Sequence, residues 1–281
     1  MSQSFAIVTP NYNMAGYLAQ TIESVLSNMR DGDQYFIIDG GSSDGSVDII
    51  RRYASRITGW VSEKDRGYAD ALAKGFARSR SEYQCWINSG DLLLTGTLDE
   101  ARRQLASTGA DFVFGDDLYI DEDGRVLQVT NGRTDALPDM MLFGGWTPLQ
   151  DACYWRRSLY EKVGGIDPEQ RYAADYDLFL RMSLGGDCRY VPAVFSAFRR
   201  HAGQTSHRHA KGYRLEREQC RRRELQRATA GAIRKAVLGA CYWWKVRWRA
   251  RMQARNRKLG NLVGAAVSEL RCLEYGSVRS G

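Results

Sequence analysis

The stretch Cys85-Trp86-Ile87-Asn88-Ser89-Gly90-Asp91 combines an apolar run with an abrupt polar end. Residues 83–87 are mostly aromatic or β-branched, which is typical of a buried strand. Asn, Ser, Gly and Asp come directly after this run, and all four favour turns. In an open α/β sheet, ligands bind outside the carboxyl ends of the strands. The stretch therefore indicates either a cation or phosphate site at a strand end, or an ordinary turn in which Asp91 caps the next element.

Three earlier apolar runs, at residues 5–8, 35–38 and 60–62, end in the same polar way. Helical patterns separate the runs, at residues 18–29, 47–53 and 68–78. This alternation predicts an α/β fold with a mostly parallel sheet and right-handed crossovers. Because the carboxyl ends of parallel strands meet at one edge, four polar residues should gather there and suit a phosphorylated, polyhydroxylated ligand. They are Asn11, Asp39, Asp65 and Asp91.

The second half of the chain should add antiparallel pairing and make the sheet mixed. A strand is expected at 112–114, and residues 119–127 read as a hairpin with Asp123-Gly124 at its tip. Further strands are expected at 150–155, 190–191 and 195–198, and helices at 157–163 and from Ala174 onward. Acids in a first helical turn are favoured by the helix dipole, so Asp175 and Asp177 read as helix-start residues whatever the function.

The composition is that of a soluble protein with a substantial core. The chain has 281 residues, of which 43% are hydrophobic and 26% charged, enough for one large α/β domain with an extension or for two small domains. No run approaches the ~18 apolar residues of a membrane span, and no secretion signal is apparent. Six cysteines without a C-x-x-C pair favour reduced thiols over a disulfide framework or zinc site, and hence a cytoplasmic location.

The net charge of +7 is unevenly distributed. Residues 211–258 contain 16 Lys/Arg and 3 Asp/Glu, a net of +13, which leaves 24 basic and 30 acidic residues, a net of −6, for the rest. A mildly acidic body with a basic C-terminal arm suggests that the arm meets a polyanion, either an anionic membrane surface or nucleic acid. The Gly-rich loop at 40–46 is neither a G-x-G-x-x-G fingerprint nor a P-loop, which disfavours dinucleotide oxidoreductases and P-loop NTPases.

Seven sequence blocks carry a family resemblance. They are I-V-T-P-N-Y-N (7–13), I-D-G-G-S-S-D-G-S (38–46), S-E-K-D-R-G-Y-A-D-A-L-A-K-G (62–75), I-N-S-G-D (87–91), E-K-V-G-G (161–165), A-D-Y-D-L-F-L-R (174–181) and R-R-H-A-G-Q-T-S (199–206). In this order, over about 200 residues, they resemble the family-2 glycosyltransferases of bacterial polysaccharide synthesis. Those are inverting enzymes with the nucleotide-sugar-binding GT-A fold.

The resemblance implies a donor site. By analogy with the family, the nucleoside pocket would comprise Thr9, Pro10, Asn11, Tyr12 and Asp39. The diphosphate and base side would be flanked by Asp65, Arg66 and Asp70. Asn88 and Asp91 occupy the positions of the family's Asp-x-Asp motif, where Mn²⁺ or Mg²⁺ bridges the donor phosphates and offsets the charge of the leaving group. His201 matches a position near the diphosphate or metal, so Asp91 and His201 are the expected metal ligands, although Arg199 and Arg200 could equally hold phosphate.

The resemblance also implies a catalytic base and an acceptor side. Asp175 matches the acid that takes the proton from the acceptor hydroxyl, whereas Asp177 is interpreted as structural. Gln150 lies where relatives line the acceptor side. Two departures stand out, because Gly90 replaces the first of two adjacent acids in the metal motif, and Ala174 replaces the Glu that usually precedes the base.

The predicted domains are a GT-A catalytic domain at 1–206 and a basic helical extension with tryptophans at 207–281. One helix is expected at 207–226, and an apolar stripe at residues 233–252 has Lys and Arg beside it. Such a helix lies in a membrane interface or packs on the catalytic domain; no recognised motif supports nucleic-acid binding. We favour the membrane, which would place the protein peripherally at the inner face of the cytoplasmic membrane.

These observations predict an inverting glycosyltransferase that moves a sugar from a nucleotide-sugar donor to a hydroxyl of a lipid-linked or growing glycan, of exopolysaccharide, capsule or O-antigen type. Two alternatives compete with it. A sugar nucleotidyltransferase has a similar sheet but normally carries a Gly-rich basic motif near its N-terminus. A non-catalytic membrane or nucleic-acid binder on a degenerate transferase domain would account for Gly90 and Ala174.

Overall fold

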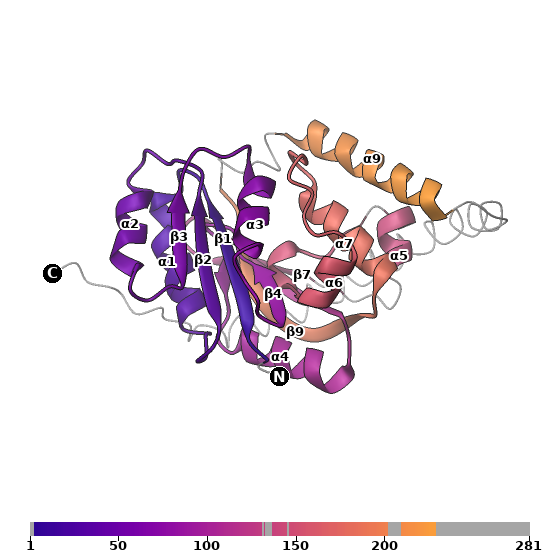
Figure 1. Cartoon of the computed structure of the whole chain (residues 1–281), viewed down its shortest axis with the longest axis horizontal. Coiled ribbons are helices and arrows are strands. Elements are labelled where there is room, and N and C mark those ends of the chain that lie inside the picture. Colours follow the sequence, from indigo (N-terminus) through magenta and orange to yellow (C-terminus); the bar gives the residue numbers. More distant parts are fainter. Residues whose placement is uncertain (1–2, 131, 133–136, 145, 202–208, 229–281) are drawn as a thin grey trace. The chain divides into compact units, whose positions relative to one another are not determined.

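The computed structural model describes residues 3–130, 132, 137–144, 146–201 and 209–228 (Figure 1). The chain divides into two compact units, Met1–Arg227 and Ala228–Gly281. Helix α9 (Ala210–Ala228) packs on the core of the first unit, and the predicted division into domains at residue 206 stays a prediction. The apolar stripe at 233–252 lies outside the described residues.

The first half of the chain forms a parallel sheet with crossover helices, as predicted. Its strands are β1 (Phe5–Asn11), β2 (Gln34–Asp39), β3 (Gly59–Ser62) and β4 (Tyr83–Trp86), in the spatial order β3-β2-β1-β4. The helices between them are α1 (Ala15–Leu26), α2 (Ser46–Tyr53) and α3 (Tyr68–Phe76). Figure 1 shows the arrowheads of β1, β2 and β3 at one edge of the sheet, so the loops that follow these strands lie together.

The second half makes the sheet mixed. It adds β5 (Leu92–Leu93), β6 (Phe112–Ile120), β7 (Val126–Thr130), β8 (Cys153–Arg156) and β9 (Cys188–Arg199). The order continues from β4 as β8-β6-β9-β5, with β7 beside β6. Only β6 and β9 are parallel here. The predicted hairpin is confirmed, with Gly124 at φ 85°, and the two short strands predicted at 190–191 and 195–198 are one strand, β9.

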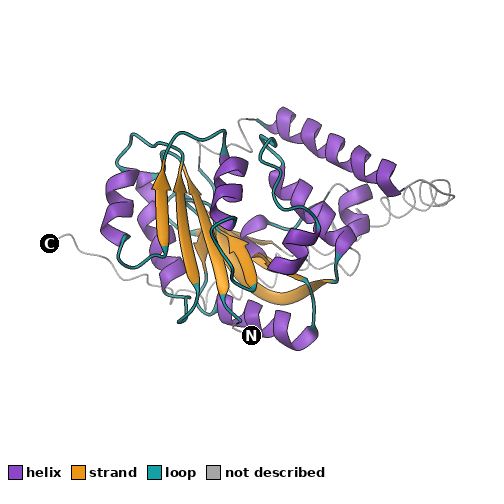
Figure 2. Cartoon of the chain, in the orientation of Figure 1, coloured by secondary structure: helices purple, strands orange, loops and turns teal. Residues whose placement is uncertain are grey.

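Helices cover both faces of the sheet (Figure 2). Besides α1, α2, α3 and α9, the described helical elements are α4 (Thr97–Thr108), α5 (Leu137–Asp139), the π-helical turn η1 (Met140–Gly144), the 3-10 turn η2 (Gln150–Ala152), α6 (Arg157–Lys162) and α7 (Ala174–Gly185). One apolar core joins α3, α7 and α9 to the sheet through Leu72, Phe179 and Cys220. A second core joins α1 and α4 to the sheet through Leu18 and Leu105, and a smaller third one lies between β5, β6 and β9. Among the described residues, no helix is long and apolar enough to cross a membrane.

Candidate active site

Asp39 ties together the ends of the first three strands. Its carboxylate is fully buried and accepts hydrogen bonds from Asn11 Nδ2 (2.6 Å), Ser42 Oγ (2.5 Å) and Ser62 Oγ (2.6 Å). Burial alone would raise the pKa of Asp39, but the hydrogen bonds from Ser42, Ser62 and Asn11 outweigh it and lower the pKa. Asn11 and Asp39 therefore lie together at the strand ends, but Asp39 faces protein donors and its contact with a nucleoside stays a prediction.

The neighbouring β1 residues differ in what they expose. The Thr9 hydroxyl is buried and pairs with Tyr35 Oη at 2.9 Å, so it is not available to a ligand. Tyr12 is 64% exposed, which leaves its ring open to stack on a flat group. Asn11 Oδ1 is buried and has no hydrogen-bond partner among the described residues. The Pro10 carbonyl accepts a hydrogen bond from Ser89 Oγ at 3.1 Å and joins β1 to the loop after β4.

The loop between β3 and α3 closes on the same edge. A Cβ atom at Gly40 would lie 2.8 Å from Asp65 Oδ2, so glycine is required for Asp65 to approach the backbone. Burial raises the pKa of the Asp65 carboxyl against the hydrogen bond from the Gly67 N–H. Asp70 is buried and pairs with Arg66 at 3.0 Å and Lys74 at 3.2 Å. Arg66 is exposed and also pairs with Glu169, so a cation stands at the rim of this cluster.

Asp91 points into the protein. Its Oδ1 accepts the Arg199 backbone N–H at 2.9 Å, and Asn88 Nδ2 lies 3.4 Å from its Oδ2. The side chain of Arg199 in turn donates from Nε to the Gly90 carbonyl at 2.9 Å. Asp91 is only 5% exposed, and burial, together with the nearby charge of Asp151, raises its pKa well above the usual range. The carboxyl group of Asp91 therefore holds the loop after β4 against β9.

These placements do not fit a metal site built by the protein alone. In the part of the chain that the structure describes, no three His, Cys, Asp or Glu side chains come together as metal ligands. Both oxygens of Asp91 are engaged by protein donors, and Gly90 has no side chain to offer a cation. The His201 ring lies 5.8 Å from the Tyr17 ring, centroid to centroid. A metal held by Asp91 and His201 stays a prediction.

Two further buried acids lie near Asp91, one in the sheet and one in the turn η2, and neither was predicted. Asp117 on β6 accepts a hydrogen bond from Ser196 Oγ on β9 at 3.0 Å. Asp151 on η2 is 1% exposed, and burial raises its pKa to about 7, whereas burial and the charge of Asp151 raise the pKa of Asp117 well above normal. Next to Asp151, the amide of Gln150 is buried without a hydrogen-bond partner among the described residues. A role for Gln150 toward the acceptor stays a prediction.

Asp175 stands in the first turn of α7, as predicted. It is partly exposed, its Oδ1 is buried, and Tyr213 Oη of α9 lies 3.5 Å from Oδ2. Burial raises the pKa of Asp175 to about 6, against the backbone N–H of Tyr176 and the charge of Arg217. A carboxylate that titrates near neutrality suits general-base catalysis. Asp177 differs, because it is buried and forms ion pairs with Arg181 (2.5 Å) and Arg223, which agrees with the structural role predicted for it.

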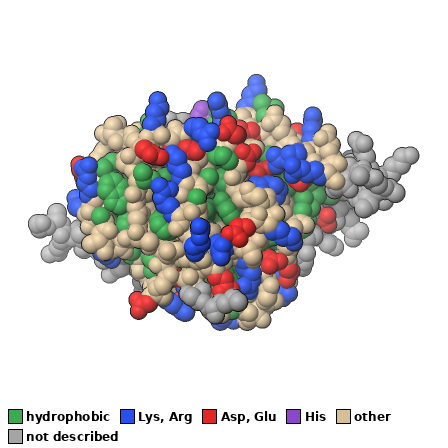
Figure 3. Space-filling model, viewed as in Figure 1, with side chains coloured by type: hydrophobic (Ala, Val, Ile, Leu, Met, Phe, Trp, Pro, Cys, Tyr) green, Lys and Arg blue, Asp and Glu red, His purple; other side chains and the backbone are tan. Residues whose placement is uncertain are grey.

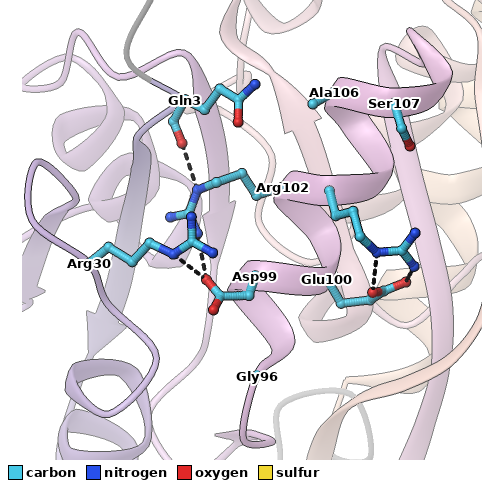
Figure 4. A pocket seen from close by; sticks show the side chains of 9 residues that line it. Gln3, Arg30, Gly96, Asp99, Glu100, Arg102, Ala106 and Ser107 are labelled. Atoms are coloured by element: carbon cyan, nitrogen blue, oxygen red, sulfur yellow. Dashed lines mark hydrogen bonds and ion pairs between the residues drawn. The ribbon is translucent and has the colours of Figure 1, made fainter.

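A pocket of about 650 Å³ lies elsewhere, beside α4, and contains none of the predicted site residues (Figure 4). Its cations are already paired. Arg102 donates to the Gln3 carbonyl at 2.7 Å, Arg30 pairs with Asp99 at 2.6 Å and Arg103 pairs with Glu100. This pocket therefore offers no unpaired arginine to an anionic ligand.

The profile of the family described as Glycosyl transferase family 2 matches residues 6–202, about 70% of the chain. The chain belongs to this glycosyltransferase family. The match spans all the sequence blocks that carried the resemblance except the last residues of the R-R-H block. The predicted enzyme class, a nucleotide-sugar-dependent glycosyltransferase, is thereby confirmed.

Curated relatives agree with the family. A PGL/p-HBAD biosynthesis glycosyltransferase of Mycobacterium tuberculosis is 24% identical over 71% of this chain and 78% of its own length. Glycosyltransferase GlyG of Streptococcus pneumoniae is 25% identical over 50% of this chain, which spans about half (48%) of that relative. The putative teichuronic acid biosynthesis glycosyltransferase TuaG of Bacillus subtilis is 27% identical over 43% of this chain and 50% of its own.

Solved structures show the same fold. The mannosyltransferase PcManGT from Pyrobaculum calidifontis, solved with GDP-Man and Mn²⁺, has a TM-score of 0.60 and 17% identity, covering 95% of this chain and 81% of its own. S. aureus TarS 1-349 in complex with UDP-GlcNAc has a TM-score of 0.58 and 14% identity, covering 72% and 60%. The predicted α/β fold of GT-A type, with helices flanking a mixed sheet, is confirmed.

Proposed function

We propose that this glycosyltransferase moves a sugar from a nucleotide-sugar donor to a hydroxyl group of a lipid-linked or growing bacterial glycan, with inversion at the anomeric carbon. The observation that carries the proposal is Asp175, a carboxylate in the first turn of α7 with its pKa raised to about 6. Relatives named for PGL/p-HBAD and teichuronic acid biosynthesis support a glycan or glycolipid acceptor.

In the proposed reaction, Asp175 takes the proton of the acceptor hydroxyl while that oxygen attacks the anomeric carbon of the donor. The new carbon–oxygen bond forms on the face opposite the departing nucleoside diphosphate, whose own bond to the anomeric carbon breaks. A single base at this position is sufficient for inversion, because no covalent sugar–enzyme intermediate forms. Asp177 could not replace it, because its ion pairs with Arg181 and Arg223 occupy its carboxylate.

The group of residues at the strand ends is the proposed donor site. The exposed ring of Tyr12 would stack on the nucleoside base, and the unpartnered Asn11 Oδ1 would accept a hydrogen bond from it. Arg66 at the rim would pair with the diphosphate after release from Glu169. UDP-GlcNAc and GDP-Man are bound by two proteins of the same fold, which supports a donor of the same chemical class.

Attachment to the inner face of the cytoplasmic membrane is the remaining part of the proposal. A lipid-linked acceptor would require the catalytic unit to work at the membrane surface. Basic side chains of α9, including Lys211, Arg214 and Arg222, are exposed, and Figure 3 shows Lys and Arg on the face where α9 lies. Such side chains favour an anionic surface. The Trp-containing part of the predicted anchor lies outside the described residues.

A donor panel tests the proposal directly. We expect one of UDP-, GDP- or dTDP-sugars to raise the thermal unfolding midpoint of the full chain, in Mn²⁺, in Mg²⁺ or in EDTA. The stabilising donor is then used in a transfer assay with lipid-linked acceptors, and NMR of the product reports the anomeric configuration. Retention of configuration would contradict inversion, and the absence of stabilisation by every donor would contradict the donor site. Equal turnover in EDTA and Mn²⁺ would exclude the predicted metal requirement.

A further inference from the structure

Helix α7, which carries Asp175, has no cap of its own. Its N-cap residue is Ala173, whose side chain cannot accept a hydrogen bond, and no side-chain cap is formed there. The first backbone N–H groups of a helix have no partner within the helix, so a buried helix start needs acceptors from elsewhere. Ala173 and Ala174 are both buried. Without outside partners this start would fray, and Asp175 would move with it.

Two distant side chains bind the amides at this start. Glu216 binds those of the three residues that lead into α7, and Tyr68 binds the first two of the helix itself. The Glu216 carboxylate of α9 accepts the N–H groups of Arg171 (3.2 Å), Tyr172 (2.7 Å) and Ala173 (2.9 Å). The Tyr68 hydroxyl of α3 lies 2.8 Å from the Ala174 N–H and 3.4 Å from the Asp175 N–H, and it donates to the Tyr172 carbonyl at 3.3 Å. Successive amides from 171 to 175 are therefore bound by residues of α9 and α3.

Helix α9 is itself held in place beside α7. The ring of His209 stacks on Tyr172 with centroids 5.0 Å apart, and a Cβ atom at Gly212 would lie 2.6 Å from the Tyr172 ring, so the two segments are in close contact. The guanidinium of Arg217 lies 4.6 Å from the Tyr176 ring centroid, and Arg223 forms an ion pair with Asp177. These contacts fix the position of Glu216 as well as the position of α7.

We propose that Glu216 and Tyr68 are positioning residues of the transferase, which hold the first turn of α7 so that Asp175 meets the acceptor hydroxyl. The inference rests on the proposed role of Asp175 as the base. It makes α9 part of the catalytic machinery, although the family profile ends at residue 202. A misplacement of about 1 Å can cost about 10²-fold in rate, so the order of this turn matters for catalysis.

Three variants of the full chain test the role of Glu216. Glu216→Ala removes the acceptor, Glu216→Gln keeps an amide oxygen that can accept two N–H groups, and Glu218→Ala is the matched control. Glu218 lies on the same helix but pairs with Arg221 and Arg222 instead of α7. We expect Glu216→Ala to lower kcat by about 10²-fold with an unchanged KM for the donor, and Glu216→Gln to recover most of the rate. Tyr68→Phe should lower kcat in the same way.

Hydrogen exchange separates the inference from the proposed function. Glu216→Ala should lose amide protection at Tyr172 and Ala173, and Glu218→Ala should keep it. Unchanged protection in Glu216→Ala, or equal kcat values in Glu216→Ala and Glu218→Ala, would overturn the inference while the proposed function stands. A fall in kcat that Glu216→Gln does not recover would overturn it too. Full turnover by Asp175→Asn would overturn the base assignment, and the positioning role with it.

Discussion

The pH dependence of the reaction should follow the protonation of Asp175. Because a general base must be deprotonated, kcat/KM should rise as pH increases through about 6, the pKa to which burial raises this carboxyl. Asp175→Asn should lower kcat by roughly 10²–10⁴-fold and leave donor binding unchanged, since the substitution removes only the base. Initial rates from pH 5 to 8 and donor titrations by calorimetry check both points. A profile without a rise near pH 6 in the wild type would contradict the assignment.

Gly90 should tolerate no side chain. Its φ of 115° is unfavourable for any L-residue, and a Cβ atom there would lie 3.2 Å from Met14 Cε. Gly90→Ala should therefore destabilise the fold by about 1–3 kcal/mol. Gly16→Ala is the control, because Gly16 lies in α1 with nothing within 4 Å of the added methyl group, and the change should stabilise the fold by about 0.5–1 kcal/mol. Urea denaturation measures both; equal stabilities of the two variants would contradict the strain at Gly90.

The positions of the site residues at the strand ends could be predicted from the sequence, but their hydrogen-bond partners could not. The strand-end positions of Asp39 and Asp91 follow from local hydrophobic patterns, and the structure confirms those positions. Their hydrogen bonds do not follow, because Asp91 meets Arg199 across 108 positions of sequence. Glu216 and Tyr68 left no local signal at all, since a carboxylate on a basic helix and a tyrosine at a helix start are common surface residues. Their importance depends on the contacts that α9 and α3 make with the start of α7.

Arg199 at the end of β9 joins several elements through one guanidinium. This buried side chain donates to the carbonyls of Gly90, Asp121 and Glu122, and to Gln20 Oε1 of α1 at 2.7 Å. Arg199→Met would leave the buried Gly90 carbonyl without this donor and would break the links to α1 and to residues 121–122, so we expect a loss of about 2–3 kcal/mol in unfolding free energy. The neighbouring Arg200 is exposed and lies over the Tyr119 ring, so Arg200→Met should cost no more than about 1 kcal/mol. Urea denaturation of both variants checks the contrast, which equal losses would contradict.

Prediction of the elements succeeded where the apolar pattern was dense. The parallel strands β1 to β4 consist of apolar runs ended by polar residues, and all four were predicted. Helix α4 was not predicted, because its apolar pattern is sparse. The only apolar residues on its buried face are Leu98, Ala101 and Leu105, and Arg102 is buried beside them. Strand β9 was predicted as two pieces, since Pro192 between them has no N–H to donate to a neighbouring strand. The register of β9 with β6 also shifts near Val194.

The buried acids Asp91, Asp117 and Asp151 should make the stability of the unit Met1–Arg227 depend on pH. Because burial raises the pKa of Asp151 to about 7 from about 3.8, its contribution to folding is fully present below pH 3.8 and is lost as pH rises through 7. Asp151→Asn mimics the neutral acid, so its unfolding midpoint should exceed that of the wild type at pH 8 by a few degrees and should vary less from pH 5 to 8. Thermal unfolding followed by circular dichroism measures the two curves. Curves that run parallel over this range would contradict the raised pKa.

The division of the chain after Arg227 leads to a prediction at the scale of the whole molecule. A protein that ends at Ala228 retains Glu216, the buried Cys220 and every other described contact of α9, so it should unfold in one cooperative transition and keep its turnover of a soluble acceptor. A protein that ends at Ser206 would expose the face of α7 that α9 covers and leave the amides at 171–173 without Glu216. We therefore expect a lower unfolding midpoint and little turnover.

The same pair of proteins separates catalysis from membrane attachment. If residues 229–281 contain the anchor, the full chain should float with anionic liposomes, and the protein that ends at Ala228 should stay in the soluble fraction at physiological salt despite its basic α9. Flotation on neutral liposomes is the control for the electrostatic part of binding. Undiminished flotation of the shorter protein would place the attachment on the catalytic unit, and the exposed basic side chains of α9 would then be the first to substitute. Loss of turnover together with loss of flotation would contradict the separation, since the shorter protein keeps every residue that positions Asp175.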